Sequence, residues 1–283
     1  MDKAQKDNLY IKKIIETSTS PFFIGRIAGV ELKVAYNFLK GNVLDVADDL
    51  VYLETNAGIR VENNDSLKKY VEILVKSYEN STVIAEWETD GKVYSRTGVG
   101  QQLITSRTPN TPKIDARALE PYYFKESWMP ALKGKRVLII HPFVNTFKKQ
   151  SENLKTLFPG RSWFEDCELT FIAPPFTLAG NHGEKDWQEH YAEFIKQLRE
   201  LKEFDVALVA AGGYGMPISN FIYKELGKSV IYVGGALQLF FGVIGKRWFE
   251  NKDILKIMND DWIRPVSADK PANFSQVERG CYW

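Results

Sequence analysis

Cysteine is scarce in this chain of 283 residues, and neither sign of charge is in excess. The two cysteines, Cys167 and Cys281, exclude a disulfide framework and favour a reducing compartment. A net charge of +1 gives no electrostatic reason to expect a nucleic-acid partner. The first residues contain no apolar signal core, and the longest apolar run, around 236–244, is too short to span a bilayer. We therefore expect a cytoplasmic protein without a transmembrane segment.

Several common site motifs are missing as well. The sequence contains no GxGxxG, no P-loop pattern and no GxSxG, which argues against a standard dinucleotide fingerprint, a P-loop and a serine-hydrolase elbow. His182 and His190 stand in NHGEKDWQEH at a spacing that matches no common zinc site.

What the sequence does contain is a regular alternation in its second half. Apolar runs of strand length are separated by stretches whose apolar residues recur at helical spacing. This alternation is typical of a parallel sheet covered by helices on both faces. The predicted strands are RVLIIH from Arg136, ELTFIA from Glu168, DVALVA from Asp205 and SVIYV from Ser229; the predicted helices are Thr146–Phe158, Trp187–Leu201, Pro217–Leu226 and one running through Phe241.

The first half is less regular. The pattern predicts helices over Asn8–Thr17, Val30–Leu39 and Ser66–Glu79, and strands at PFFIGRIAG (21–29) and TVIAEWE (82–88). The stretch Thr89–Pro121 is rich in loop-forming residues. Because no repeat or low-complexity linker divides the chain, we expect one α/β domain over 1–283, Rossmann-like, with a mostly parallel sheet and a helical N-terminal portion. A domain boundary near Gly134 is the alternative.

Two glycine turns follow successive predicted strands in the second half. In an open parallel sheet, ligands bind beyond the carboxyl ends of the strands, and missing side chains let a ligand approach the backbone. The N–H groups that open the following helices favour an anion. We therefore expect a pyrophosphate at these turns, although tight turns without a ligand would use the same residues. The turns consist of Gly212, Gly213, Tyr214 and Gly215, and of Gly234 and Gly235.

Charged residues near the strand ends are the candidates for chemistry. Lys246 and Arg247 follow the last predicted helix, where they could neutralise a diphosphate or only complement the helix dipole. Glu31 follows the turn after the first strand, and His141 ends a later strand, so either could act as a general base. A helix-terminal acid and a core-edge histidine would occupy the same positions for purely structural reasons.

Several stretches of the sequence together resemble one known family. GRIAGVEL (25–32) resembles an RxGDGE-like segment that follows the first strand of that family. LKGKRVLIIHPFVNTFKKQ (132–150) and FDVALVAAGGYGMPISNFIYKELGKSVIYVGGA (204–236) resemble its later strand and helix blocks. The closing GKRW, WIRP and GCYW resemble uncharacterised proteins from polysaccharide gene clusters and large viruses that are associated with the same fold, and EPYYF is the one loose match within 89–130. The family is the GT-D type of bacterial glycosyltransferases.

The resemblance implies an enzyme that transfers a sugar from a UDP- or GDP-sugar donor to a hydroxyl of a glycan acceptor, often with Mn²⁺ or Mg²⁺. Position by position, Arg26 matches the family's arginine and Glu31 its second acid, while Gly29 stands where the first acid is expected. Glu31 would then be a metal ligand or the base that deprotonates the acceptor, with His141 as the other candidate base.

The donor site implied by this hypothesis uses both glycine turns. The diphosphate would lie on the turns, and Arg247, with Lys246 or Arg26, would offset the charge of the departing nucleotide. The pocket for the sugar or the base would be shaped by Tyr214, Gln238 and Trp248.

Two other hypotheses stay open. A nucleotide- or glycan-binding module without activity would account for the missing acid at Gly29. A methyltransferase or dehydrogenase of the Rossmann type would need a glycine fingerprint after its first strand and an acid after its second. HPF after RVLIIH and PP after LTFIA supply neither. The sequence also leaves self-association into a homo-oligomer open.

Overall fold

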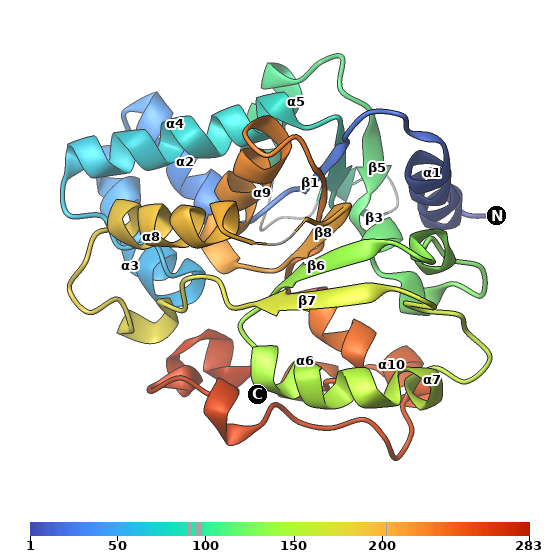
Figure 1. The fold of residues 1–283 in the computed structure, drawn as a ribbon. Coiled ribbons are helices and arrows are strands. Elements are labelled where there is room, and N and C mark those ends of the chain that lie inside the picture. The colour runs from blue at the N-terminus through green and yellow to red at the C-terminus, as the bar shows by residue number, and fades with distance from the viewer. Residues whose placement is uncertain (90–91, 94–97, 202) are drawn as a thin grey trace.

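The centre of the molecule is a sheet of seven parallel strands in the order β5–β2–β1–β9–β8–β6–β7 (Figure 1). This computed structural model describes residues 1–89, 92–93, 98–201 and 203–283. The predicted α/β, Rossmann-like fold is thereby confirmed. The sheet strands are β1 (Phe23–Arg26), β2 (Val83–Glu86), β5 (Lys113–Asp115), β6 (Arg136–Ile140), β7 (Glu168–Ile172), β8 (Val206–Val209) and β9 (Ser229–Tyr232); β3 (Glu88–Thr89) and β4 (Lys92–Val93) form a separate antiparallel pair.

Continuous apolar runs explain the inner strands. β8 is buried along its whole length, as expected for a parallel strand that is covered on both faces. In β6, Val137 and Ile139 pack into the core on one face of the sheet, while Leu138 and Ile140 pack into the core on the other. β7 lies at the edge of the sheet and is only partly buried.

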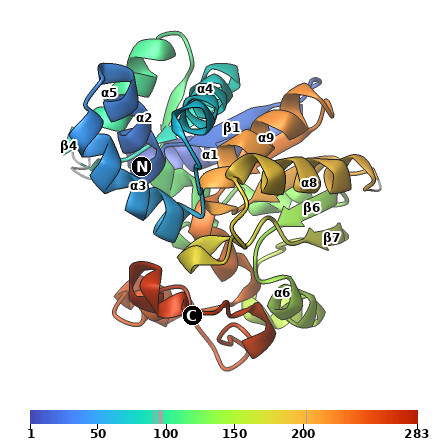
Figure 2. The ribbon, with the colours of Figure 1, turned by 90° about the vertical axis from the view of Figure 1, so that its left-hand side faces the viewer.

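Helices cover both faces of the sheet. Their apolar stripes supply the two cores, because an amphipathic helix is stable only when that stripe is buried. One layer contains α2 (Val30–Lys40), α3 (Val43–Ala57), α4 (Asn64–Asn80), α5 (Gly98–Arg107), α8 (Trp187–Arg199) and α9 (Gly215–Lys224). The other contains α1 (Lys3–Thr17), α6 (Val144–Gln150), α7 (Leu154–Leu157) and α10 (Lys252–Ile257). Figure 2 shows α8 and α9 on one side of the strands and α6 on the other.

Capping residues fix where several helices begin and end. Asp186 is the N-cap of α8 and forms a capping box with Glu189. Its carboxylate also accepts a hydrogen bond from the Ser66 hydroxyl at 2.5 Å, which fastens the start of α4 to the start of α8. At the other end, α2 and α3 stop at Gly41 and Gly58, whose φ values of 72° and 76° are left-handed and favour glycine.

The C-terminal segment folds beneath the sheet on the side of α6 (Figure 2). Asp269 anchors it, because its carboxylate accepts hydrogen bonds from the Thr146 backbone N–H at 2.7 Å and from the Thr146 hydroxyl at 2.6 Å. This carboxylate satisfies an open N–H group in the first turn of α6. The indole N–H of Trp283 donates to the Asp269 carbonyl at 3.1 Å, so the last residues are held in place.

The main differences from the sequence predictions lie in three places. The predicted last helix is a 3₁₀ helix, η7 (Gly234–Phe241), which stops at left-handed Gly242, so Lys246 and Arg247 do not close it. They belong to a separate 3₁₀ turn, η8 (Lys246–Trp248). The loop-rich stretch Thr89–Pro121 contains α5 and β5, and α3 was not predicted at all.

Two other expectations bear on the whole chain. The single sheet combines strands from both sides of Gly134, since β1 pairs with β9 and β2 with β1; the one-domain assignment stays a prediction. Within the residues that the structure describes, no helix is both long enough and apolar enough to cross a bilayer.

Candidate functional site

The candidate site lies at the carboxyl ends of β1 and β9, which are neighbours in the sheet. The chain leaves β1 through α2 on one face of the sheet, whereas it leaves β9 through η7 on the other. Adjacent strands whose connections diverge in this way form a topological switch point, where open α/β sheets bind their ligands. A ligand site is therefore expected at this edge of the sheet.

Arg26 is the last residue of β1 and reaches into this switch point. Its guanidinium lies over the Trp87 ring, 4.6 Å from the ring centroid, and beside Gly234 at the end of β9. Its backbone is fixed by Tyr78, whose hydroxyl donates to the Arg26 carbonyl at 2.8 Å and accepts from the Ala28 N–H at 3.1 Å. The arginine is thus positioned by an aromatic ring and by its own main chain.

A second arginine approaches from the C-terminal segment. Arg247 lies 5.1 Å from the ring centroids of both Trp248 and Tyr282. Its backbone N–H donates to the Cys281 carbonyl at 2.9 Å, which joins η8 to the last residues. Among the described residues, no ion pair involves Arg26 or Arg247. Guanidinium groups that are held by rings and form no close ion pair can receive an external anion.

Three glutamates, Glu31, Glu120 and Glu278, interact through their charge with these arginines, and we call them together with Arg26, Arg247 and Tyr282 the charged cluster. Glu31, in the first turn of α2, is buried, and this burial raises its pKa above the ordinary value, opposed by its own backbone N–H and by Arg26. Burial also raises the pKa of Glu120, opposed by Arg26 and by a hydrogen bond from the Tyr122 hydroxyl at 2.9 Å. Both carboxyls therefore hold a proton to higher pH than an exposed glutamate.

The third glutamate, Glu278, comes from a strained turn near the C-terminus. Glu278 and Arg279 have φ values of 45° and 60°, a left-handed conformation that is unfavourable for both residues. The Cys281 thiol donates to Glu278 Oε2 at 3.2 Å. Burial and this hydrogen bond raise the pKa of Cys281 to about 12, so it stays a thiol.

The structure gives the first glycine turn a packing role. A Cβ on Gly213 would collide with Ile59, and one on Gly215 would collide with the Tyr232 ring. The Gly212 carbonyl accepts a hydrogen bond from Tyr232 at 3.1 Å, and the Gly213 carbonyl accepts one from Tyr70 at 3.0 Å. These contacts argue against the expectation that the missing side chains leave room for a pyrophosphate, because the end of α3, Ile59 and two tyrosines occupy the space next to these glycines.

The second turn is also covered by the chain, but by residues of the charged cluster. A Cβ on Gly234 would meet the Arg26 guanidinium, and one on Gly235 would lie 2.6 Å from the Tyr282 ring. These glycines therefore let Arg26 and Tyr282 approach the end of β9.

Several predicted site residues serve the core. His141 is buried, its Nδ1 accepts a hydrogen bond from the Phe143 N–H at 2.9 Å, and burial lowers its pKa to about 3. A packed, neutral imidazole of this kind argues against His141 as the base. Gln238 is fully buried, and its amide donates to the Val243 and Tyr282 carbonyls at 3.0 and 3.3 Å. Tyr214 is buried as well. Their burial argues against a place for these two side chains in the lining of an open sugar pocket.

The two sequence neighbours of Arg247 that were predicted as site residues differ in their exposure. Trp248 is buried and supports the Arg247 guanidinium, whereas Lys246 is exposed. Arg26, Glu31, Arg247 and Gly234 are thus brought to one place, as the sequence hypothesis requires. Their roles stay predictions.

A divalent ion held by protein ligands alone does not suit the residues around Glu31. Gly29 supplies no carboxylate, and within the described residues no three His, Cys, Asp or Glu side chains are grouped so that they could hold an ion. The charge of Glu278 raises the pKa of Glu31, so Glu278 is the candidate for a second carboxylate ligand. Two carboxylates are fewer protein ligands than such ions usually take.

Sequence reasoning missed four members of this arrangement. Trp87, Glu120, Glu278 and Tyr282 lie far from Arg26 in the sequence and follow no motif of fixed spacing. The only signals were the phrases EPYYF and GCYW, which contain Glu120 and Tyr282 and which the resemblance had already singled out.

Comparisons of the whole chain gave no match to a protein-family model, to a curated protein or to a solved structure.

Proposed function

We propose that the protein is a glycosyltransferase that uses a nucleoside diphosphate sugar. The observation that carries the proposal is the pair Arg26 and Arg247, both held against aromatic rings and in no ion pair with another described residue, beside buried Glu31 at the β1–β9 switch point. A diphosphate carries the charge and the acceptor oxygens that two such guanidinium groups bind best.

The two arginines would act mainly on the leaving group. As the bond between the anomeric carbon and the diphosphate oxygen breaks, negative charge grows on that oxygen, and fixed cations at this edge lower the barrier. Trp87 and Tyr282 keep the guanidinium groups in place before the donor arrives, so little reorganisation is needed. The pyrophosphate would therefore contact arginine side chains rather than the first glycine turn.

Glu31 is the candidate base. Its carboxylate would take the proton of the acceptor hydroxyl while the acceptor oxygen forms the new bond to the anomeric carbon. Burial raises the pKa of Glu31 and so brings its basicity closer to that of an effective base at neutral pH. Because the residues present do not suit a protein-held ion, the proposal assigns the neutralisation of the diphosphate to the arginines and not to Mn²⁺ or Mg²⁺.

Calorimetry with a panel of UDP- and GDP-sugars, with and without a chelator, tests the proposal. We expect a donor to bind in the presence of the chelator and Arg26→Gln or Arg247→Gln to weaken binding about tenfold or more. Arg199→Gln is the matched control, because Arg199 also lies over a ring, 5.2 Å from the Phe221 centroid, but on a different helix. If no donor binds, or if all three variants bind it equally well, the proposal is wrong.

A nucleotide- or glycan-binding module is the second candidate, favoured by Gly29 at the position of an expected acid. Release of free nucleotide from the bound donor separates the two. An enzyme should release it slowly even without acceptor, and Glu31→Gln should stop this release while the donor still binds. A donor that binds and stays intact in both proteins would identify a module.

A further inference from the structure

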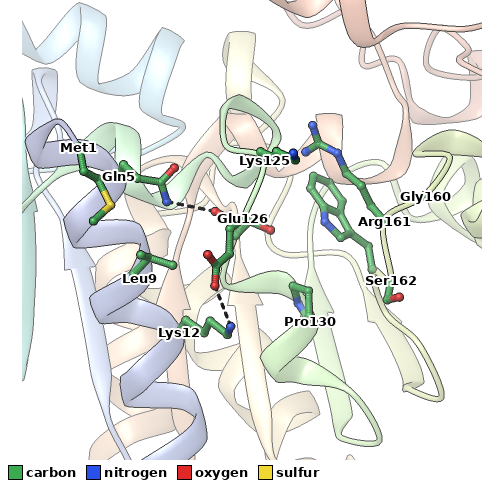
Figure 3. A pocket seen from close by; sticks show the side chains of 12 residues that line it. Met1, Gln5, Leu9, Lys12, Lys125, Glu126, Pro130, Gly160, Arg161 and Ser162 are labelled. Carbon is green, nitrogen blue, oxygen red and sulfur yellow. Dashed lines mark hydrogen bonds and ion pairs between the residues drawn. The ribbon is translucent and has the colours of Figure 1, made fainter.

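A second feature lies apart from the charged cluster. A cavity of about 630 Å³ lies between α1, the segment that leads into η3 (Met129–Leu132) and the loop before β7, and Figure 3 shows the side chains that line it. Pockets that bind small molecules commonly enclose about 300–1,000 Å³. Its walls combine apolar side chains such as Leu9 and Trp163 with polar ones such as Gln5 and Ser162. Its volume therefore falls in the range of small-ligand sites, and its lining is more polar than most of them.

Arg161 is the most informative residue of this cavity. It is half-buried, and its guanidinium lies 5.4 Å from the Trp163 ring centroid and 6.0 Å from that of Phe158. Among the described residues it has no acidic partner; Nη1 makes only long contacts of 3.5 and 3.4 Å with the Pro121 and Tyr122 carbonyls. Burial lowers the pKa of Arg161, and no neighbouring carboxylate offsets this effect. A cation in that position lacks the anion that would balance its lost hydration.

The other charged side chains of the cavity are those of Lys12, Lys125 and Glu126, so positive charge is in excess. Lys12 extends from α1 and forms an ion pair with Glu126 at 3.2 Å, and the Gln5 side chain donates to the Glu126 carbonyl at 3.1 Å (Figure 3). Lys125, next to Glu126, is exposed and forms no ion pair within the described part of the chain. Because Glu126 is already engaged by Lys12, it does not neutralise Lys125 or Arg161.

We propose that this cavity binds a small organic anion, with Arg161 and Lys125 holding its carboxylate or phosphate group. The guanidinium would donate its remaining N–H groups to two anion oxygens, and the Trp163 ring and the α1 side chains would contact the body of the ligand. A sugar acid and a sugar phosphate share this chemistry. The site stands on residues that the proposed glycosyl transfer does not use.

The experiment is binding by calorimetry or ligand-observed NMR with glucuronate, glucose 1-phosphate and inorganic phosphate, with neutral glucose as the comparison. We expect one of the two sugar anions to bind and glucose not to bind. Arg161→Gln should weaken that binding by about tenfold, and Lys125→Gln, which changes an exposed side chain, by about threefold. Arg199→Gln and Arg26→Gln should leave it unchanged, and the latter separates this site from the charged cluster.

Each outcome decides the proposal. Anion binding that both pocket variants weaken and that Arg26→Gln spares supports it, whether or not any nucleotide sugar binds elsewhere. Preference for glucuronate over glucose 1-phosphate, or the reverse, identifies the source of the anionic group. Equal binding of glucose, binding of inorganic phosphate alone, or anion binding of unchanged affinity in Lys125→Gln and Arg161→Gln would overturn it.

Discussion

Gly245→Ala should weaken the attachment of the last three residues, Cys281–Trp283, to the rest of the molecule. A Cβ at Gly245 would lie 2.5 Å from the Tyr282 carbonyl oxygen and 2.7 Å from the Cys281 carbonyl oxygen. Both atoms belong to the backbone and cannot rotate away. The φ of Gly245 is −103°, so the backbone conformation suits alanine and the whole effect of the substitution is steric.

The size of the effect follows from what must move. To accommodate the methyl group, the segment Cys281–Trp283 has to shift by several tenths of an ångström, which weakens the 2.9 Å hydrogen bond from the Arg247 N–H to the Cys281 carbonyl. Overpacking of this kind costs about 1–3 kcal/mol in the free energy of unfolding. The melting temperature should fall by about 2–4 °C for each kcal/mol lost.

Thermal unfolding and hydrogen exchange measure the two consequences. We expect a lower melting temperature and faster exchange in the C-terminal segment than in the β-sheet. Gly98→Ala is the control, since a Cβ at Gly98 would meet nothing within 4 Å. If Gly245→Ala has the melting temperature and the exchange rates of Gly98→Ala, the Tyr282 carbonyl does not approach Gly245 as closely as the structure indicates.

Three further substitutions test the support of the site. Glu31→Gln removes a carboxyl whose raised pKa makes the folded protein bind its proton more tightly than the unfolded chain does. The stability of the wild type should therefore fall relative to that of the variant as pH rises above 4.5. An equal difference between the urea midpoints of the two proteins at low and at neutral pH would contradict this. Tyr78→Phe removes the hydroxyl that accepts from the Ala28 N–H, and should cost about 1–3 kcal/mol in urea unfolding; a neutral result would mean that water replaces it. Asp269→Ala leaves Thr146 without its acceptor and should cost about 2–3 kcal/mol, with faster hydrogen exchange confined to α6 and the C-terminal segment; uniform exchange would argue against a local anchor.

Much of the fold could be predicted from the sequence because buried parallel strands are continuous apolar runs. β6, β8 and β9 lie where RVLIIH, DVALVA and SVIYV predicted them, and β1 lies within PFFIGRIAG. Bounding glycines and prolines made these runs easy to recognise. Length and composition are enough to identify such strands.

The helix α3 shows where pattern analysis loses its signal. Leu44, Val51 and Tyr52 are exposed apolar side chains on this helix, while Leu53 is fully buried. Apolar residues on both the exposed and the buried sides blur the helical period on which the prediction depends. α5 and β5 were missed for a different reason: glycines and prolines in and around them predicted loops, and β5 has only three residues.

The candidate site was only half accessible to sequence reasoning. Arg26 and Glu31 share one short segment, so a motif can carry both, and Arg247 was found from its place after a predicted helix. Glu120 comes after the edge strand β5 and interacts through its charge with Arg26 and Arg247. No local sequence pattern indicates this interaction between distant parts of the chain. The glycine turns could not distinguish a ligand site from packing, because glycine is equally suited to a position where another part of the chain approaches the backbone.

The position of β1 has a consequence for how the polypeptide reaches this state. β1 lies in the middle of the sheet between β2 and β9, and the Phe22 N–H donates to the Ser229 hydroxyl 207 residues away. During synthesis, β1 can pair with β2 early, yet its other edge stays open until β9 emerges. Contacts of such long range are closed slowly, and an open apolar edge invites pairing with other chains. Refolding from urea should therefore be slow and depend on protein concentration, and nascent chains that stop before β9 should be clients of chaperones.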